Sequence, residues 1–197
     1  MRILIIDIYY CGFLTDFYKK NPELLRATYE DQKSALMGKC FGTSDFYSQN
    51  LKKLGHEATE IIFNAYNLQT AWAKEHGVKY NKLYPYFKNI PKLRSWFRPD
   101  WDVKILEAQI KEFRPDVIYC QSLSAPSPEV MSKLKKYTRL LVGQVACPTN
   151  FDRKELEHFD LIFTSFPHFI QKFKDIGINA KYLKIAFEPK ILEKITR

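Results

Sequence analysis

Polar side chains with possible chemistry follow the apolar segments of this chain that have the length of buried strands. Asp7 lies in the apolar run Arg2–Ile8, and Gln121 and Gln144 lie at or near the ends of two later runs. The carboxyl ends of parallel strands meet at one edge of a sheet, where open α/β proteins bind their ligands. The sequence therefore predicts a ligand-binding edge, although every loop after a strand also needs polar residues for its turns.

A glycine-containing segment, Gly38–Asp45, overlaps the start of a helix predicted over Gly42–Leu54. Backbone N–H groups at a helix N-terminus attract anions, so this segment could cradle a phosphate. It lacks both the G-x-G-x-x-G pattern and the Gly-Lys-Ser/Thr ending of a P-loop. An ordinary helix cap by Thr43 or Ser44 explains the same residues at least as well.

His168 lies in the first turn of a helix predicted to start after a cap at Ser165 and to end at Gly177. At that position the imidazole could exchange a hydrogen bond with a ligand, or it could simply cap the loop, and the two readings weigh equally.

Other sources of chemistry find little support. Cys147 could act as a nucleophile, but a thiol at a strand end is more often a small apolar residue. The chain has no G-x-S-x-G motif, and His76 and His158 lack partners at ligand spacing. No serine-hydrolase chemistry and no metal site is therefore predicted.

The elements that must position these residues alternate between strands and helices. The predicted strands are Arg2–Ile8, His56–Phe63, Asp116–Gln121, Leu140–Ala146, Leu161–Thr164 and Ala180–Leu183. The predicted helices are Gly42–Leu54, Asn64–His76, Asp100–Phe113, Ser127–Tyr137 and the helix after Ser165. This order predicts an α/β fold with a doubly wound, mostly parallel, Rossmann-like sheet of about six strands and helices on both faces.

Length and composition fit one large globular domain of 197 residues, with 46% hydrophobic and 27% charged residues. No run of 18 apolar residues is present, so no membrane span is expected. Four cysteines at wide, irregular spacing predict free thiols and a cytoplasmic location. The formal charge of +9 fits nucleic acid, an anionic membrane surface or anionic small molecules, and decides among none of them.

The segment Lys79–Pro99 interrupts the alternation with basic and aromatic residues and no acidic ones. Such a mixture is typical of surfaces that bind single-stranded nucleic acid or other anionic partners. A long connection whose rings fold back on the core is the structural alternative. An irregular insertion of this length is uncommon in a compact domain, so we favour a binding loop.

Five ordered segments together resemble the amino-terminal domain of CgeB-like (spore-maturation type) glycosyltransferases, which have the two-domain GT-B fold. They are FGTSDFYSQNLKKLGHEATEI, AWAKEHGV, FRPDVIYCQSL, VGQVACP and TSFPHFIQKFKDIGINAKYLKIAFEP. The resemblance covers roughly residues 1–189. It implies that this region is a Rossmann-like, acceptor-side domain, and that residues 190–197 begin the crossover to a carboxyl-terminal domain absent from this chain.

The resemblance also implies roles for particular residues. The acceptor-side and cleft-lining candidates are Gly42, Thr43, Ser44, Asp45, Gln121, Gln144, Pro148 and His168. An inverting mechanism needs an acceptor-side general base, for which Asp45 and His168 are the candidates, whereas a retaining mechanism can proceed without one. The family holds its nucleotide-sugar donor mainly in the carboxyl-terminal domain, so no firmly bound cofactor is expected here and this part alone is expected to be inactive.

Two other functions remain open at this point. The chain could be a stand-alone binding module that holds nucleic acid or a polyanionic polymer through Lys79–Pro99. A receiver-like signalling domain would rest on Asp7 alone, because the acidic pair expected beside it is absent.

Overall fold

A computed structural model describes residues 1–80, 101–123, 125–147 and 152–195, and its centre is a parallel sheet. The strands are β1 (Arg2–Asp7), β2 (Glu57–Ile62), β3 (Val117–Cys120), β4 (Leu140–Val145), β5 (Leu161–Thr164) and β6 (Ala180–Tyr182). All neighbouring strands pair in parallel, in the order β2-β1-β3-β4-β5-β6. The predicted α/β, Rossmann-like, doubly wound fold is confirmed.

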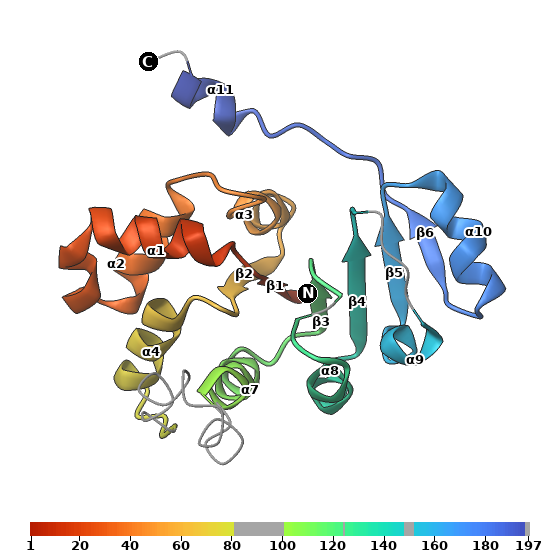
Figure 1. Ribbon diagram of the computed structural model, residues 1–197, viewed down its shortest axis with the longest axis horizontal. Coiled ribbons are helices and arrows are strands. Elements are labelled where there is room, and N and C mark those ends of the chain that lie inside the picture. The colour runs from red at the N-terminus through yellow and green to blue at the C-terminus, as the bar shows by residue number, and fades with distance from the viewer. Residues whose placement is uncertain (81–100, 124, 148–151, 196–197) are drawn as a thin grey trace.

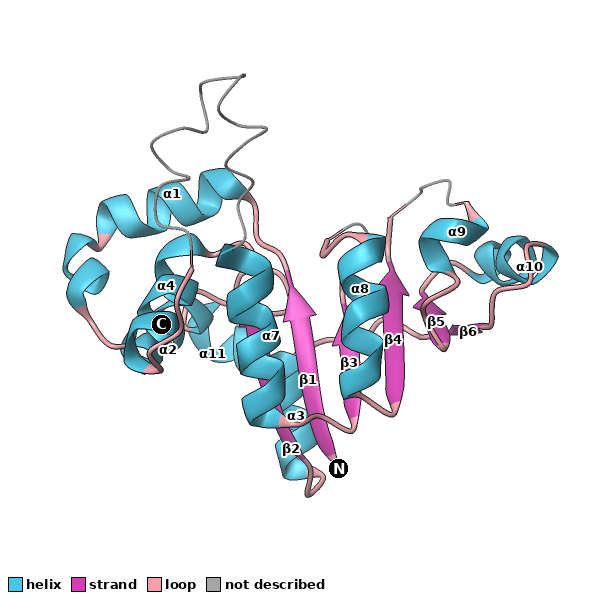
Figure 2. Cartoon of the chain, turned by 90° about the horizontal axis from the view of Figure 1, so that it is seen from below, coloured by secondary structure: helices cyan, strands magenta, loops and turns pink. Residues whose placement is uncertain are grey.

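Helices cover both faces of the sheet. On one face α3 (Phe46–Lys53) packs on β1 and β2, and on the other α7 (Trp101–Phe113) and α8 (Pro128–Leu134) pack over the central strands (Figures 1 and 2). The remaining helices are α1 (Cys11–Lys20), α2 (Tyr29–Met37), α4 (Tyr66–Glu75), α9 (Arg153–Leu156), α10 (Pro167–Asp175) and α11 (Lys190–Ile195). None of the helices in the described ranges is long and apolar enough to cross a membrane.

The core is built on strands that are buried on both faces. Leu4, Ile5 and Ile6 of β1 are at most 1% exposed, as expected for a central parallel strand. Leu4 and Ile6 pack with α7 and α8, whereas Ile5 and Tyr119 face α3 through Tyr47. Side chains therefore alternate between the two faces along each strand.

Several boundaries differ from the predicted ones. The helix predicted from Gly42 begins at Phe46, because residues 42–45 form a turn, so neither Thr43 nor Ser44 is its cap. Helix α10 begins at Pro167 with Phe166 at the cap position, so the predicted cap at Ser165 is wrong. The helix predicted over residues 127–137 is α8 followed by a 3₁₀ turn, Lys135–Tyr137.

Sequence patterns did not predict the segment between β1 and α3, which forms α1, a 3₁₀ helix (Pro22–Arg26) and α2. Helix α1 has no side-chain cap, so it carries no start signal. Helix α2 does carry one, because the Thr28 side chain accepts a hydrogen bond of 3.2 Å from the Asp31 backbone N–H. These helices lie beyond the β2 edge of the sheet (Figure 1).

Gly143 of β4 lies where the face opposite α3 is most closely packed. A Cβ atom there would overlap Leu123 Cδ2 and lie 3.2 Å from Phe159 Cδ1, and both side chains belong to the buried core. The close approach of these two side chains to the strand therefore requires glycine.

Gly143→Ala is expected to lower the free energy of unfolding by about 1–3 kcal/mol, because the added methyl group overpacks a filled site. Urea denaturation measures the change. Gly12→Ala is the matched control, since a Cβ at Gly12 of α1 meets nothing within 4 Å. Equal effects of the two substitutions would contradict the packing argument.

Candidate functional site

Strand order reverses at β1, because the chain leaves β1 for β2 on one side and returns to β3 on the other. Ligand sites of open parallel sheets lie at such a point, beyond the carboxyl ends of the strands. Asp7 ends β1, and Gln121 follows β3 directly. The Thr43 hydroxyl donates a hydrogen bond of 2.5 Å to Gln121 Oε1, which brings the turn before α3 to the same place. We call Asp7, Thr43 and Gln121 the switch-point cluster.

The Asp7 carboxyl group is half-buried, and its surroundings change its acidity. Burial raises the pKa of Asp7 from 3.8 to about 6, although the Ile8 backbone N–H and the nearby Thr43 hydroxyl act in the opposite direction. The Ile8 N–H donates to Asp7 Oδ1 at 2.8 Å. A carboxyl group with this pKa is mostly ionised at neutral pH and accepts protons more readily than an ordinary aspartate.

An unusual backbone turn holds Thr43 in place. Cys40, Gly42 and Ser44 have φ angles of 51°, 59° and 47°, in the left-handed region that favours glycine. The Ser44 hydroxyl is buried and donates a hydrogen bond of 2.7 Å to the Met37 carbonyl, which ties the turn to the end of α2. Ser44 therefore fixes the turn, while Gly42 is exposed and Thr43 half-buried.

Gln144 extends the switch-point cluster along the sheet. It lies in β4 on the face that carries Tyr119, and its side-chain oxygen accepts a hydrogen bond from the Tyr119 hydroxyl. The Tyr119 ring contacts Tyr47 of α3 and Phe163 of β5, with ring centroids 5.5 and 6.4 Å apart. Gln144 is half-buried, one residue before the end of β4.

Asp45 is held by a residue 145 positions away. Both of its carboxylate oxygens accept hydrogen bonds of 3.0 Å from Lys190 Nζ of α11. Asn50 of α3 also donates to Glu188 Oε2 at 2.8 Å, so the segment after β6 runs across the molecule and docks on α3 (Figure 1). Asp45 is only 8% exposed, and its carboxylate is paired with Lys190 in this structure.

His168 lies apart from these residues. It is the second residue of α10, it is exposed, and its ring contacts Phe166 and Phe169 at 5.7 and 4.7 Å. Helix α10 follows β5 and lies on the far side of β4 from α3 (Figure 1). Within the described residues, no recorded contact joins His168 to Asp45 or to the switch-point cluster.

Two predicted features lie outside the described residues. Pro148 is one, and residues 81–99 of the predicted Lys79–Pro99 loop are the other. Over the ranges that the structure does describe, no group of three or more histidine, cysteine, aspartate or glutamate side chains is arranged to hold a metal ion.

Comparisons of the chain with protein-family models, with curated proteins and with solved structures find no match.

The sequence alone predicts neither a catalytic role for Asp7 nor a contact of Lys190. The signal for Asp7 was present, since it is the only acid in the first apolar strand, and that strand precedes the reversal of strand order. No signal pointed to Lys190, because its partner Asp45 is remote in sequence.

Asp7→Asn is expected to change the pH dependence of stability. The raised pKa means that the folded state binds the Asp7 proton more tightly than the unfolded chain, so stability falls as pH rises from about 4 to above 6. The variant cannot ionise, so near pH 7.5 its free energy of unfolding should exceed that of the wild type by up to about 3 kcal/mol. Urea denaturation near pH 4 and pH 7.5 measures the difference, which should shrink at the lower pH.

Asp16→Asn, at an exposed carboxylate of α1, is the matched control. A stability gain for Asp7→Asn that is the same at both pH values would show that burial does not hold the Asp7 pKa up.

Lys190→Met is expected to release the segment after β6 from α3. Amide hydrogen exchange of residues 188–195 should accelerate, because the ion pair to Asp45 is lost. The free energy of unfolding should change by only about 1 kcal/mol or less, since the Lys190 side chain is 39% exposed and its pair is screened by water. Lys181→Met on β6 is the control, and unchanged exchange in Lys190→Met would refute the anchoring role.

Proposed function

We propose that the carboxyl edge of this sheet is the acceptor-binding side of a nucleotide-sugar-dependent glycosyltransferase. The observation that supports the proposal most directly is the switch-point cluster, in which Asp7, Thr43 and Gln121 meet where strand order reverses. The resemblance of the sequence to the amino-terminal domain of CgeB-like glycosyltransferases supports the same assignment. Thr43, Gln121 and Gln144 are half-buried and polar, as side chains that orient an acceptor should be.

In an inverting reaction, Asp7 is our first candidate for the general base. Its carboxylate takes the proton of the acceptor hydroxyl while that oxygen forms a bond to the anomeric carbon of the donor. The bond from that carbon to the nucleoside diphosphate breaks, and the diphosphate leaves with the electron pair. A base with a pKa of about 6 suits this step at neutral pH.

Asp45 and His168 remain the alternatives for the base. For Asp45 to act, Lys190 would first have to leave its carboxylate. For His168 to act, the acceptor would have to extend along the edge as far as α10. Asp7 needs neither condition, which is why it ranks first.

The proposal includes a second domain that carries most of the donor site, and a cytoplasmic location. None of the four cysteines, all of which lie in the described ranges, forms a disulfide bond, which supports a reducing compartment.

Transfer assays with a panel of nucleotide sugars test the proposal. The chain alone should transfer no sugar, whereas a parent protein that adds a second α/β domain should. In that parent, Asp7→Asn should lower kcat by about 10²–10⁴, the usual contribution of a general base. Asp45→Asn and His168→Asn should lower it less, and Asp16→Asn should leave it unchanged.

Two results would count against the proposal. One is a parent gene without a second α/β domain, and the other is a parent protein that neither transfers nor hydrolyses any nucleotide sugar. A full loss of activity in His168→Asn with an active Asp7→Asn would instead move the base to α10.

A further inference from the structure

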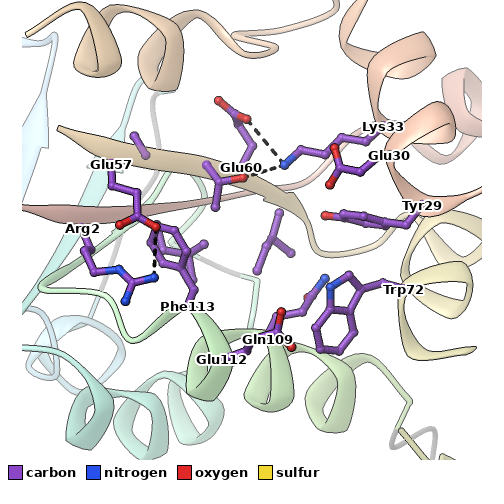
Figure 3. Close-up of a pocket in the computed structure, with 14 residues that line it drawn as sticks. Arg2, Tyr29, Glu30, Lys33, Glu57, Glu60, Trp72, Gln109, Glu112 and Phe113 are labelled. Atoms are coloured by element: carbon purple, nitrogen blue, oxygen red, sulfur yellow. Dashed lines mark hydrogen bonds and ion pairs between the residues drawn. The ribbon is translucent and has the colours of Figure 1, made fainter. Parts of the chain in front are cut away.

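A second polar site lies at the β2 edge of the sheet, among side chains that the proposed function does not use. Helices α2, α4 and α7 enclose a hollow of about 420 Å³ beside β2 (Figure 3). Its lining includes Tyr29, Lys33, Glu60, Trp72, Gln109 and Phe113. This volume falls within the roughly 300–1,000 Å³ of small-molecule sites.

Two buried side chains that line this hollow carry unpartnered polar atoms, Gln109 on the α7 side of the sheet and Glu60 on the α3 side. Gln109 of α7 is 5% exposed, and neither its amide nitrogen nor its amide oxygen has a hydrogen-bond partner among the described residues. Glu60 of β2 is 4% exposed, and its Oε1 is likewise without a partner there. Buried polar groups are nearly always paired, so each of these atoms calls for a partner that the described residues do not supply.

The charged groups of the hollow, in contrast, are largely paired with one another. Lys33 Nζ donates to Thr59 Oγ1 at 2.6 Å and lies 4.0 Å from Glu60 Oε2, and Arg2 pairs with Glu57 at 3.0 Å. The lining as a whole carries four carboxylates (Glu30, Glu57, Glu60 and Glu112) against the two cations Arg2 and Lys33. This excess of negative charge disfavours an anionic ligand such as a phosphate.

The unpartnered atoms also distinguish between a cationic ligand and a neutral one. The Gln109 nitrogen and Arg2 Nε are donors, whereas the Gln109 oxygen and Glu60 Oε1 are acceptors. A cation can satisfy only the acceptors. A hydroxyl group both donates and accepts, so a ligand with several hydroxyls can satisfy the three atoms on the α7 side, which belong to Gln109 and Arg2.

Aromatic surfaces complete the lining. Trp72 is 7% exposed and stacks on His76 with ring centroids 4.0 Å apart, which fixes its orientation. Tyr29 and Phe113 are held beneath Lys33 and Arg2, whose charged groups lie 5.7 and 4.8 Å from the two ring centroids. Flat apolar surfaces next to donors and acceptors suit the C–H faces and hydroxyl groups of a sugar ring.

We propose that the hollow between β2 and Gln109 of α7 binds a neutral saccharide unit. This site is separate from the switch-point cluster, because it lies along the outer edge of β2 and not at the carboxyl ends of β1 and β3. It does not rest on the proposed function, and its test reads binding without sugar transfer.

The test is a titration of the isotope-labelled full chain, followed by NMR. The probes are glucose, galactose, mannose, N-acetylglucosamine and ribose, with inorganic phosphate and spermidine as anionic and cationic comparisons. We expect saturable shifts of the Gln109 side-chain amide and the Trp72 indole signals with at least one sugar, and none with phosphate or spermidine.

Gln109→Met removes both unpartnered amide atoms, and it should fold because an apolar side chain suits a buried position. It should raise the Kd of the sugar about tenfold or more, equivalent to about 1.4 kcal/mol. Gln171→Met, at an exposed glutamine of α10, is the matched control and should bind like the wild type.

Three results would overturn the proposal. The first is an absence of saturable shifts with every sugar in the wild-type titration, which would mean that water alone fills the hollow. The second is binding of phosphate or spermidine in place of sugar. The third is a Gln109→Met variant that binds the sugar as tightly as the wild type.

Discussion

The reversal of strand order at β1 is the constraint on which the rest of this structure depends. Because β1 pairs with β2 on one side and β3 on the other, it is buried between two neighbours and two helix layers. Its last residue, Asp7, is therefore partly withdrawn from water, and this burial raises its pKa. The same reversal leaves room for the turn before α3, so that Thr43 can reach Gln121 across the end of the sheet.

Sequence patterns predicted the sheet well because the physics of its strands is local. A strand buried on both faces must be apolar along its length. This holds for Leu4–Ile6 of β1 and Leu141–Val142 of β4. The helix ends at Gly55, Gly77 and Gly177 were also predicted correctly. Each of these glycines has a φ angle between 66° and 80°, the left-handed conformation that ends a helix. Helices α1 and α2 were missed although their sequences carry signals, since Leu14, Phe17 and Tyr18 of α1 recur at helical spacing and Thr28 caps α2.

The candidate site was predictable only where it follows from strand ends. Gln121 directly follows β3 and Gln144 lies near the end of the neighbouring strand β4, as the strand pattern predicted, whereas their role in binding stays a prediction. The helix caps predicted at Ser165 and at Thr43 or Ser44 are wrong, because a cap depends on which way a short polar side chain turns. The Asp45–Lys190 pair was out of reach, because a contact between residues so far apart depends on how the whole chain is wound.

The charged side chains of the hollow beside β2 could protect the edge of the sheet instead of binding a ligand. An edge strand exposes backbone groups that invite pairing with other chains, and charged side chains with helix cover are common protections. Arg2, Glu57, Lys33 and Glu60 can serve that purpose as pairs, with α2 as the cover. Gln109 cannot protect the edge strand, because it lies on α7. Its unpartnered buried amide costs about 1–3 kcal/mol of stability, a cost that an apolar residue at the same position would avoid. Protection of the edge therefore accounts for the ion pairs, whereas the buried amide of Gln109 still requires a partner beyond the described residues.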